Sequence, residues 1–164
     1  MLQNRAAQDA ETGTLLKPVY DAIKFFHILI AVLALGTSAG LGIVQEFYGS
    51  HPTHGAFVLR AIERIVAFFV APGYALVLAT GLWMAELGWG WTTLWVRAAV
   101  VLWVLGATAL AGFVAVLHTQ IAMLEAGESA SRSYRRMSVA SRALGAALGV
   151  VVVAILFLMI FKPT

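Results

Sequence analysis

Residues 143–161 read ALGAALGVVVVAILFLMIF, an unbroken apolar run without a charged side chain. A helix of this length rises about 28 Å, which matches the hydrocarbon core of a bilayer at about 30 Å. Three further runs have this apolar character, at residues 22–44, 65–87 and 94–122. None of the runs alternates polar and apolar residues as a membrane-spanning β-strand would. The sequence therefore predicts an all-α membrane protein, a bundle of four transmembrane helices in up-down-up-down order.

The composition of the chain leads to the same class. Of its 164 residues, 61% are hydrophobic and only 12% are charged, whereas soluble domains have roughly half apolar and a quarter charged residues. This balance excludes a disordered chain, a nucleic-acid-binding module and an ordinary soluble enzyme, and it makes the lipid bilayer the first partner. The chain has no cysteine, so disulfides, thiolate metal sites and cysteine nucleophiles are excluded as well.

The chain divides into a polar tail, residues 1–19, and a single membrane domain, residues 20–164. The tail has no apolar run, so it does not resemble a signal peptide, and a short interfacial turn is expected to end at Pro18. With four spans, this tail, a Gly/Trp turn at 88–91 and the C-terminus share one side of the membrane, the terminal face. The loops at 46–64 and 125–142 share the opposite side, the loop face.

Basic residues orient the chain only weakly, because they are divided almost equally between the two faces. The loop face nevertheless has a cluster of them in one short loop: Arg132, Arg135, Arg136 and Arg142. Short loops rich in arginine and lysine resist translocation across a membrane. We therefore expect the loop face to lie in the cytoplasm, with the protein in the bacterial cytoplasmic membrane.

Near the terminal face, His27 lies inside the first apolar run, where a polar side chain is costly and is a functional-site hypothesis. Its helical face continues with Ala31, Ala34 and Ser38, which leave room for a flat cofactor or for a neighbouring helix. Neutral imidazole can be an axial ligand of haem iron, methionine can be the second ligand, and arginine can pair with a propionate. The alternative is a histidine that hydrogen-bonds a neighbouring helix or water. The candidate residues for binding haem b are His27, Met84, Met159 and Arg97.

On the loop face, three histidines form a second candidate site. His51 and His54 lie close together in the first loop, and His118 lies near the end of the third apolar run. Imidazole nitrogens can bind a metal ion, but no acidic residue has a spacing that fixes it as a further ligand, so solvated loop histidines are the alternative. Because most of the membrane thickness separates these residues from His27, a single cofactor cannot use both sites.

Small residues at four-residue spacing predict close helix packing, either within the bundle or in a homo-oligomer. Pro72 is expected to kink or loosen the second helix. At the start of that helix, the spacing of Arg60, Glu63 and Arg64 predicts ion pairs along the helix. The small-residue seams are Ser141, Gly145 and Gly149 in the last run, Gly36 and Gly40 in the first, and Thr108, Gly112, Ala115 and Thr119 in the third.

Short motifs follow one another along the chain: Lys24-Phe25-Phe26-His27-Ile28-Leu29, Ala71-Pro72-Gly73-Tyr74, Thr80-Gly81-Leu82, Tyr134-Arg135-Arg136 and Phe161-Lys162-Pro163. Their order and spacing resemble those of a family of bacterial predicted integral membrane proteins of unknown function. The resemblance covers roughly residues 20–163 and implies a four-helix membrane domain.

More distantly, the pattern is similar to two other four-helix membrane groups, the haem-binding, quinone-linked protoporphyrinogen oxidases and the copper-resistance D proteins. The resemblance to the oxidases implies that His27 is a haem ligand. Those oxidases have a functionally important lysine at the start of the third helix, and Arg97 stands in its place here. Because arginine keeps the charge but does not readily exchange a proton, the departure argues against porphyrinogen oxidation and leaves haem binding open.

These observations favour a b-type haem protein that exchanges electrons with a quinone or a partner protein. One alternative is a cofactor-free structural or assembly subunit of a membrane complex or homo-oligomer. Another is a metal-handling protein that uses the three histidines of the loop face. Whether the protein is an oxidoreductase stays open at this point.

Overall fold

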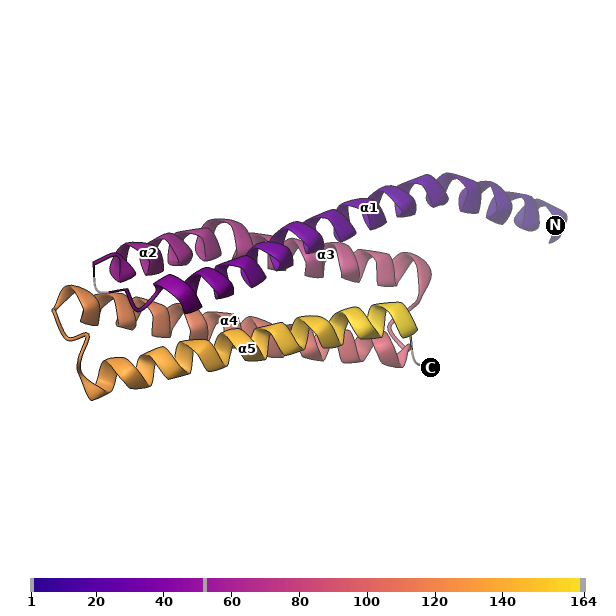
Figure 1. Ribbon diagram of the computed structural model, residues 1–164. Coiled ribbons are helices and arrows are strands. Elements are labelled where there is room, and N and C mark those ends of the chain that lie inside the picture. Colours follow the sequence, from indigo (N-terminus) through magenta and orange to yellow (C-terminus); the bar gives the residue numbers. More distant parts are fainter. Residues whose placement is uncertain (1, 52, 163–164) are drawn as a thin grey trace.

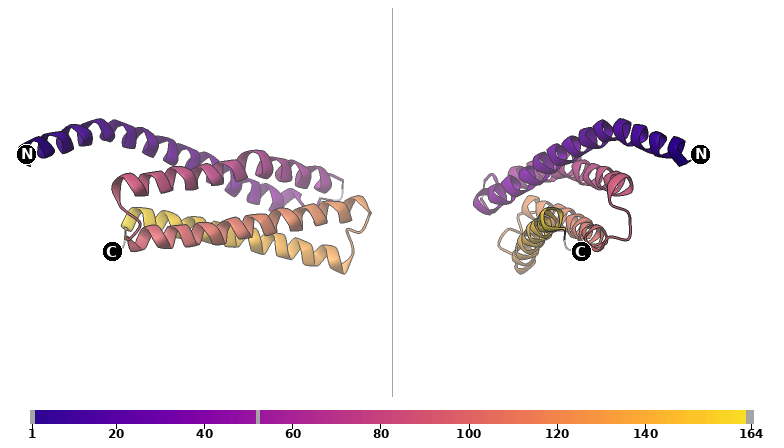
Figure 2. Two further views of the ribbon diagram at one scale, coloured as in Figure 1. Left: turned by 180° about the vertical axis from the view of Figure 1, so that it is seen from behind. Right: turned by 90° about the vertical axis from the view of Figure 1, so that its right-hand side faces the viewer.

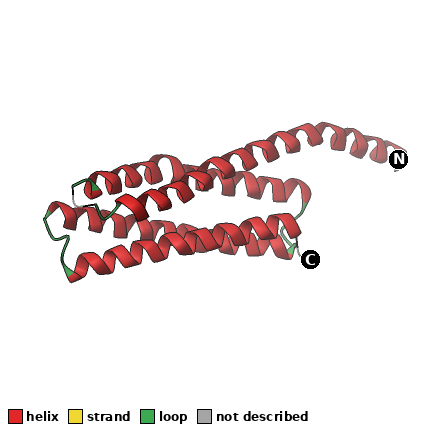
Figure 3. Cartoon of the chain, in the orientation of Figure 1, coloured by secondary structure: helices red, strands yellow, loops and turns green. Residues whose placement is uncertain are grey.

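The computed structural model describes residues 2–51 and 53–162, and within them the chain forms helices joined by short turns (Figure 3). Four stretches of this described part are long and apolar enough to cross a membrane: Lys17–Tyr48, Gly55–Gly88, Leu94–Glu125 and Arg132–Phe161. The predicted all-α fold with four membrane helices is therefore confirmed. Its elements are α1 (Leu2–Tyr48), α2 (Gly55–Ile65), the π-helical turn η1 (Val66–Val70), α3 (Ala71–Gly88), α4 (Leu94–Glu125) and α5 (Arg132–Phe161).

The helices extend beyond the apolar runs that predicted them, because polar residues at their ends continue the helical backbone. The clearest case is α1, in which the expected polar tail is helical from Leu2 onward and Pro18 lies inside the helix. The turn expected to end at Pro18 is therefore wrong. The residues before Pro18 include alanine, leucine, glutamine, glutamate, arginine and lysine, which are strong helix formers.

The helices pack as two pairs that are joined near the loop face. α1 lies along α3, α4 lies along α5, and α2 connects the pairs by packing on α4, whereas α1 and α5 touch only sparingly (Figure 1). The α1–α2 turn and the α4–α5 loop lie at one end of the bundle. The α3–α4 turn and the C-terminal end of α5 lie at the other end, beyond which the N-terminal part of α1 projects (Figure 2). The sparse α1–α5 contact leaves room for a cleft.

The most tightly packed core lies between α2, η1 and α4. Large apolar side chains elsewhere point outward, and Phe68 is 83% exposed. Such a surface would be unfavourable in water, whereas in a bilayer it contacts acyl chains. The fold therefore requires the membrane as its solvent. The buried core residues are Leu59, Ile62, Val66, Val70, Phe113, Leu117 and Ile121.

Glycines bring α1 and α3 together, but they are not the glycines of the predicted seams. A Cβ atom on Gly73 would lie 2.7 Å from the Cβ of Ala34, and one on Gly81 would lie 3.1 Å from the His27 ring. The seam glycines divide between the two alternatives. A Cβ atom on Gly112 would lie 3.7 Å from Leu144 of α5, whereas no other described part of the chain approaches within 4 Å of the Cβ positions of Gly36, Gly40, Gly145 and Gly149. For these four, packing in a homo-oligomer stays a prediction.

Pro72 follows a widened helical turn and does not end the helix. Proline has no N–H, so the carbonyl of Phe68, four residues earlier, lacks its usual donor. The π-helical turn η1 ends directly before α3, in which Pro72 is the second residue. A π turn is a known way for a helix to absorb such a defect without breaking. The loosening expected at Pro72 is therefore the π-helical turn η1.

Candidate functional site

His27 is buried in the bundle on the side of the terminal face, with 6% of its surface exposed. Its Nδ1 atom lies 2.8 Å from Oγ1 of Thr80 on α3. The Thr80 hydroxyl donates to the Leu76 carbonyl at 2.7 Å, and its oxygen can accept from Nδ1–H of His27. In a neutral ring this tautomer leaves the lone pair on Nε2, as in histidines that ligate a metal.

The cavity beside His27 is small, at about 90 Å³. Met159 also lines it, whereas Met84 does not, and Arg97 is exposed outside it. Pockets for drug-sized ligands measure about 300–1,000 Å³, so the helices as they stand leave too little space for a haem macrocycle. Of the four predicted haem residues, the structure brings together His27 and Met159 alone.

The three histidines of the loop face do not gather at one point. His51 and His54 stack in the exposed α1–α2 turn, with 5.1 Å between ring centroids. His118 lies on α4, with Nδ1 2.9 Å from Oε1 of Glu63. Residue Pro52 between the stacked histidines lies outside the described residues, and among those described no three His, Cys, Asp or Glu side chains are placed to hold a metal ion.

The charged residues at the start of α2 pair with α4 and not along their own helix. Arg60 binds Glu125, and Glu63 binds His118. The ion pairs expected along α2 are therefore wrong, because the facing helix offers closer partners than the next turn does. A further pair joins α1 to α5, with 3.1 Å between Glu46 Oε2 and Arg142 Nε.

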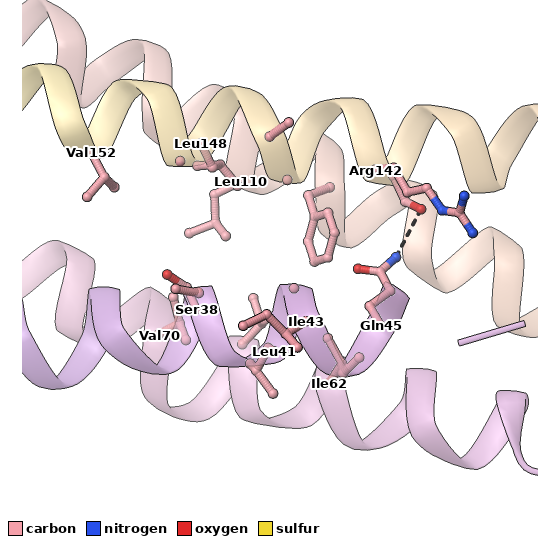
Figure 4. A pocket seen from close by; sticks show the side chains of 18 of the residues that line it. Ser38, Leu41, Ile43, Gln45, Ile62, Val70, Leu110, Arg142, Leu148 and Val152 are labelled. Atoms are coloured by element: carbon pink, nitrogen blue, oxygen red, sulfur yellow. Dashed lines mark hydrogen bonds between the residues drawn. The ribbon is translucent and has the colours of Figure 1, made fainter. Parts of the chain in front are cut away.

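A cleft of about 580 Å³ lies between α1 and α5, where these helices touch only sparingly (Figure 4). Its floor comes from α2, η1 and α4, with side chains such as Ile62 and Phe113. Gly145 and Gly149 line it from α5, and their lack of side chains widens it. The lining is mostly apolar, and it includes exposed small residues on both walls. The cleft therefore faces the lipid between two helices.

A buried chain of polar side chains reaches the loop-face end of this cleft. Gln45 of α1 donates from Nε2 to Oγ of Ser141 on α5 at 3.0 Å (Figure 4). Ser141 in turn lies 3.3 Å from Oε1 of Gln120 on α4. Gln120 donates from Nε2 to the Tyr134 hydroxyl at 3.4 Å. The exposed fractions of Gln45, Ser141 and Gln120 are 8%, 0% and 2%, so the chain ties α1, α4 and α5 together inside the protein.

Sequence reasoning missed this polar chain, although the signal was present. Gln120 lies within the third apolar run, and Gln45 directly follows the first. Amide side chains at such depths are costly unless they find partners in neighbouring helices. The spacing of Ser141 places it in a small-residue seam, whereas in the structure its hydroxyl bridges Gln45 and Gln120.

Tyr74 lies between the two cavities and lines both. Its ring stacks on Trp103 with 5.2 Å between centroids, and the Trp103 indole donates from Nε1 to the Tyr74 carbonyl at 3.1 Å. The Tyr74 hydroxyl is buried without a hydrogen-bond partner in the described residues. It packs on Gly106, where a Cβ atom would overlap it. Tyr74 thus lies, with Leu35 and Val152, where the cleft and the His27 cavity adjoin.

The fold and the lipid-facing cleft define a four-span α-helical integral membrane protein. The chain belongs to the family described as "Predicted integral membrane protein (DUF2269)", whose model matches residues 21–163. This match confirms the family resemblance of the motifs, of which Pro163 lies outside the described residues. No curated protein and no solved structure matches the chain, so the more distant likeness to haem proteins is not shown.

Proposed function

We propose that this membrane protein binds a lipid-soluble small molecule in the α1–α5 cleft. The observation that supports the proposal is an apolar cleft of about 580 Å³ with a buried amide, Gln45, at its loop-face end. Ligand pockets typically have this size, with apolar walls and a few polar groups that orient the ligand. Because the cleft opens between two helices, the ligand would enter sideways from the bilayer.

The cleft exists because two positions on α5 have no side chain. Protein interiors are otherwise close-packed, and a leucine at position 145 would project into the cleft. Gly145→Leu should therefore reduce the amount of lipid-soluble ligand that remains with the purified protein. Ala147→Leu is the matched control, because Ala147 is also an exposed small residue of α5 but does not line the cleft.

The measurement is organic extraction and mass spectrometry of both variants, purified in one mild detergent. A compound that remains bound to the wild type and to Ala147→Leu, but is depleted in Gly145→Leu, supports the proposal. Equal retention by all three proteins would overturn it.

The haem hypothesis is the second candidate, and one observation favours it: Thr80 engages Nδ1 of His27 and leaves Nε2 able to ligate iron. A haem would supply one-electron transfer with a quinone or a partner protein. Binding would require the helices around the 90 Å³ cavity to separate. An absorption spectrum tests the hypothesis: a Soret band that His27→Ala removes supports it, and a colourless, folded protein made with ample haem supply contradicts it.

The assembly hypothesis is supported by the outward-facing seam of Gly36 and Gly40 on α1. Because no other described part of the chain approaches within 4 Å of their Cβ positions, this seam is available to a second copy or to another membrane subunit. Gly36→Leu and Gly40→Leu should then lower the oligomer size measured by light scattering in detergent. An unchanged size would remove the support for assembly through α1.

A further inference from the structure

The amide oxygen of Gln45 makes the cleft favour ligands that donate a hydrogen bond. Ser141 has one hydroxyl hydrogen, and its Oγ lies 3.0 Å from the Ser138 carbonyl and 3.3 Å from Oε1 of Gln120. Both neighbours are acceptors, so Ser141 donates its single hydroxyl hydrogen to one of them and not to Gln45. Toward Gln45 the Ser141 oxygen can only accept, and the group facing it at 3.0 Å must be the amide Nε2.

This donor order fixes the orientation of the Gln45 amide. With Nε2 turned to Ser141, Oε1 is turned away from it and toward the cleft (Figure 4). No donor in the described residues hydrogen-bonds to this oxygen, although the Gln45 side chain is more than nine-tenths buried, with 8% exposed. The oxygen itself is open to the cleft, since among the described residues the Tyr74 hydroxyl is the one buried side-chain N or O atom without a partner. An amide oxygen without a donor is unfavourable in an apolar setting, so a ligand that supplies a donor gains binding free energy there.

The charges at this end of the cleft point to a neutral ligand. Glu46 and Arg142 are the charged residues that line the cleft, and they pair with each other at 3.1 Å. A charged head group would have to break this pair or remain without a counterion. A neutral hydroxyl group needs neither change, and it donates one hydrogen to Oε1.

We propose that the natural ligand of the α1–α5 cleft is a neutral lipid alcohol whose hydroxyl group donates to Oε1 of Gln45. The inference rests on the proposed function and adds the class of head group. A ketone, an ester or an ether head can accept but cannot donate, so it leaves Oε1 unpaired and places a second acceptor beside it.

Two probes with the same tail test the proposal: 1-hexadecanol and its methyl ether, each competing for the purified full-length protein in nanodiscs against radiolabelled hexadecanol. One hydrogen bond should make the alcohol bind about 3- to 10-fold more tightly than the ether. In Gln45→Leu the two probes should bind with equal affinity. Tyr134→Phe is the control, because it alters the far end of the polar chain and should keep the preference for the alcohol.

The outcomes separate the two proposals. Equal binding of both probes to the wild type, or tighter binding of the ether, overturns the head-group inference and leaves the ligand cleft standing. Binding of neither probe overturns the proposed function together with the inference. If Gln45→Leu does not fold, the wild type and Tyr134→Phe still give the comparison of alcohol with ether.

Discussion

Ser141 connects three helices through one hydroxyl group, since it accepts from Gln45 and lies beside Gln120. Ser141→Ala removes this hydroxyl and leaves two buried amides without their partner. We expect a loss of about 1–3 kcal/mol in the free energy of unfolding, the usual cost of unsatisfied buried polar groups. Thermal or denaturant unfolding in one detergent measures it. Ser133→Ala, at the exposed second residue of α5, is the control and should unfold like the wild type.

The contact between Tyr74 and Gly106 makes a second prediction. A methyl group at position 106 would overlap the Tyr74 hydroxyl, and both backbones belong to packed helices, so Gly106→Ala should destabilise the protein by about 1–3 kcal/mol. Tyr74→Phe removes a hydroxyl that has no partner in the described residues, and it should be neutral or stabilising.

A double-mutant cycle checks the cause of this effect. Tyr74→Phe combined with Gly106→Ala should recover most of the lost stability, because the overlapping atom is gone. Gly112→Ala is the control on the same helix, because its Cβ would have only ordinary contact with Leu144 at 3.7 Å. A double variant as unstable as Gly106→Ala would show that the hydroxyl contact is not the cause.

Single residues were predictable only where their type was unusual for their place. His27 could be singled out because an imidazole in an apolar run is rare, and the structure does bury it. Its haem partners could not be selected in the same way, since Met84 and Met159 have equally plausible sequence positions but only Met159 reaches the cavity. The direction in which a helical side chain points depends on how the helices are rotated, and no spacing within one helix determines that rotation.

At the scale of elements, hydrophobic runs predicted all four membrane helices but not their neighbours. Apolar length is a property of one helix, so it can be read from the chain alone. Pairing depends on which small residues meet a protruding side chain: Gly73 meets Ala34, whereas Gly145 faces the cleft. The ion pair of Arg60 with Glu125 and the contact of Glu63 with the His118 ring likewise form across helices.

The N-terminal part of α1 makes the element-scale prediction. It projects beyond the bundle (Figure 2), and the apolar run of the first span begins only at about residue 22. Removing residues 2–16 should therefore leave the unfolding temperature within about 2 °C of the wild type, a change of a few tenths of a kcal/mol. Calorimetry or a thermal shift in the same detergent measures it. A drop of more than about 5 °C would show that this part of α1 packs on the membrane domain.

At the scale of the whole molecule, the two cavities adjoin along one bundle. His27 and Met159 line the one nearer the terminal face, and Gln45 and Ser141 line the one nearer the loop face. Leu35, Tyr74 and Val152 line both, so a ligand in the cleft would approach the His27 cavity past these side chains. Lipid binding and haem binding can be tested separately. Changes at Gln45 should affect the binding of the lipid-soluble ligand, while changes at His27 should affect the haem absorption spectrum.

The arginines of the loop face predict the orientation of the whole molecule. Arg132, Arg135 and Arg136 begin α5 and are exposed, and such clusters remain on the cytoplasmic side. Because the chain has no cysteine, single cysteines can report the side directly. With a membrane-impermeant maleimide on intact cells, Thr92→Cys in the α3–α4 turn should be labelled. Ser129→Cys in the α4–α5 loop should react only after the membrane is opened, and the reverse pattern would place the arginines outside.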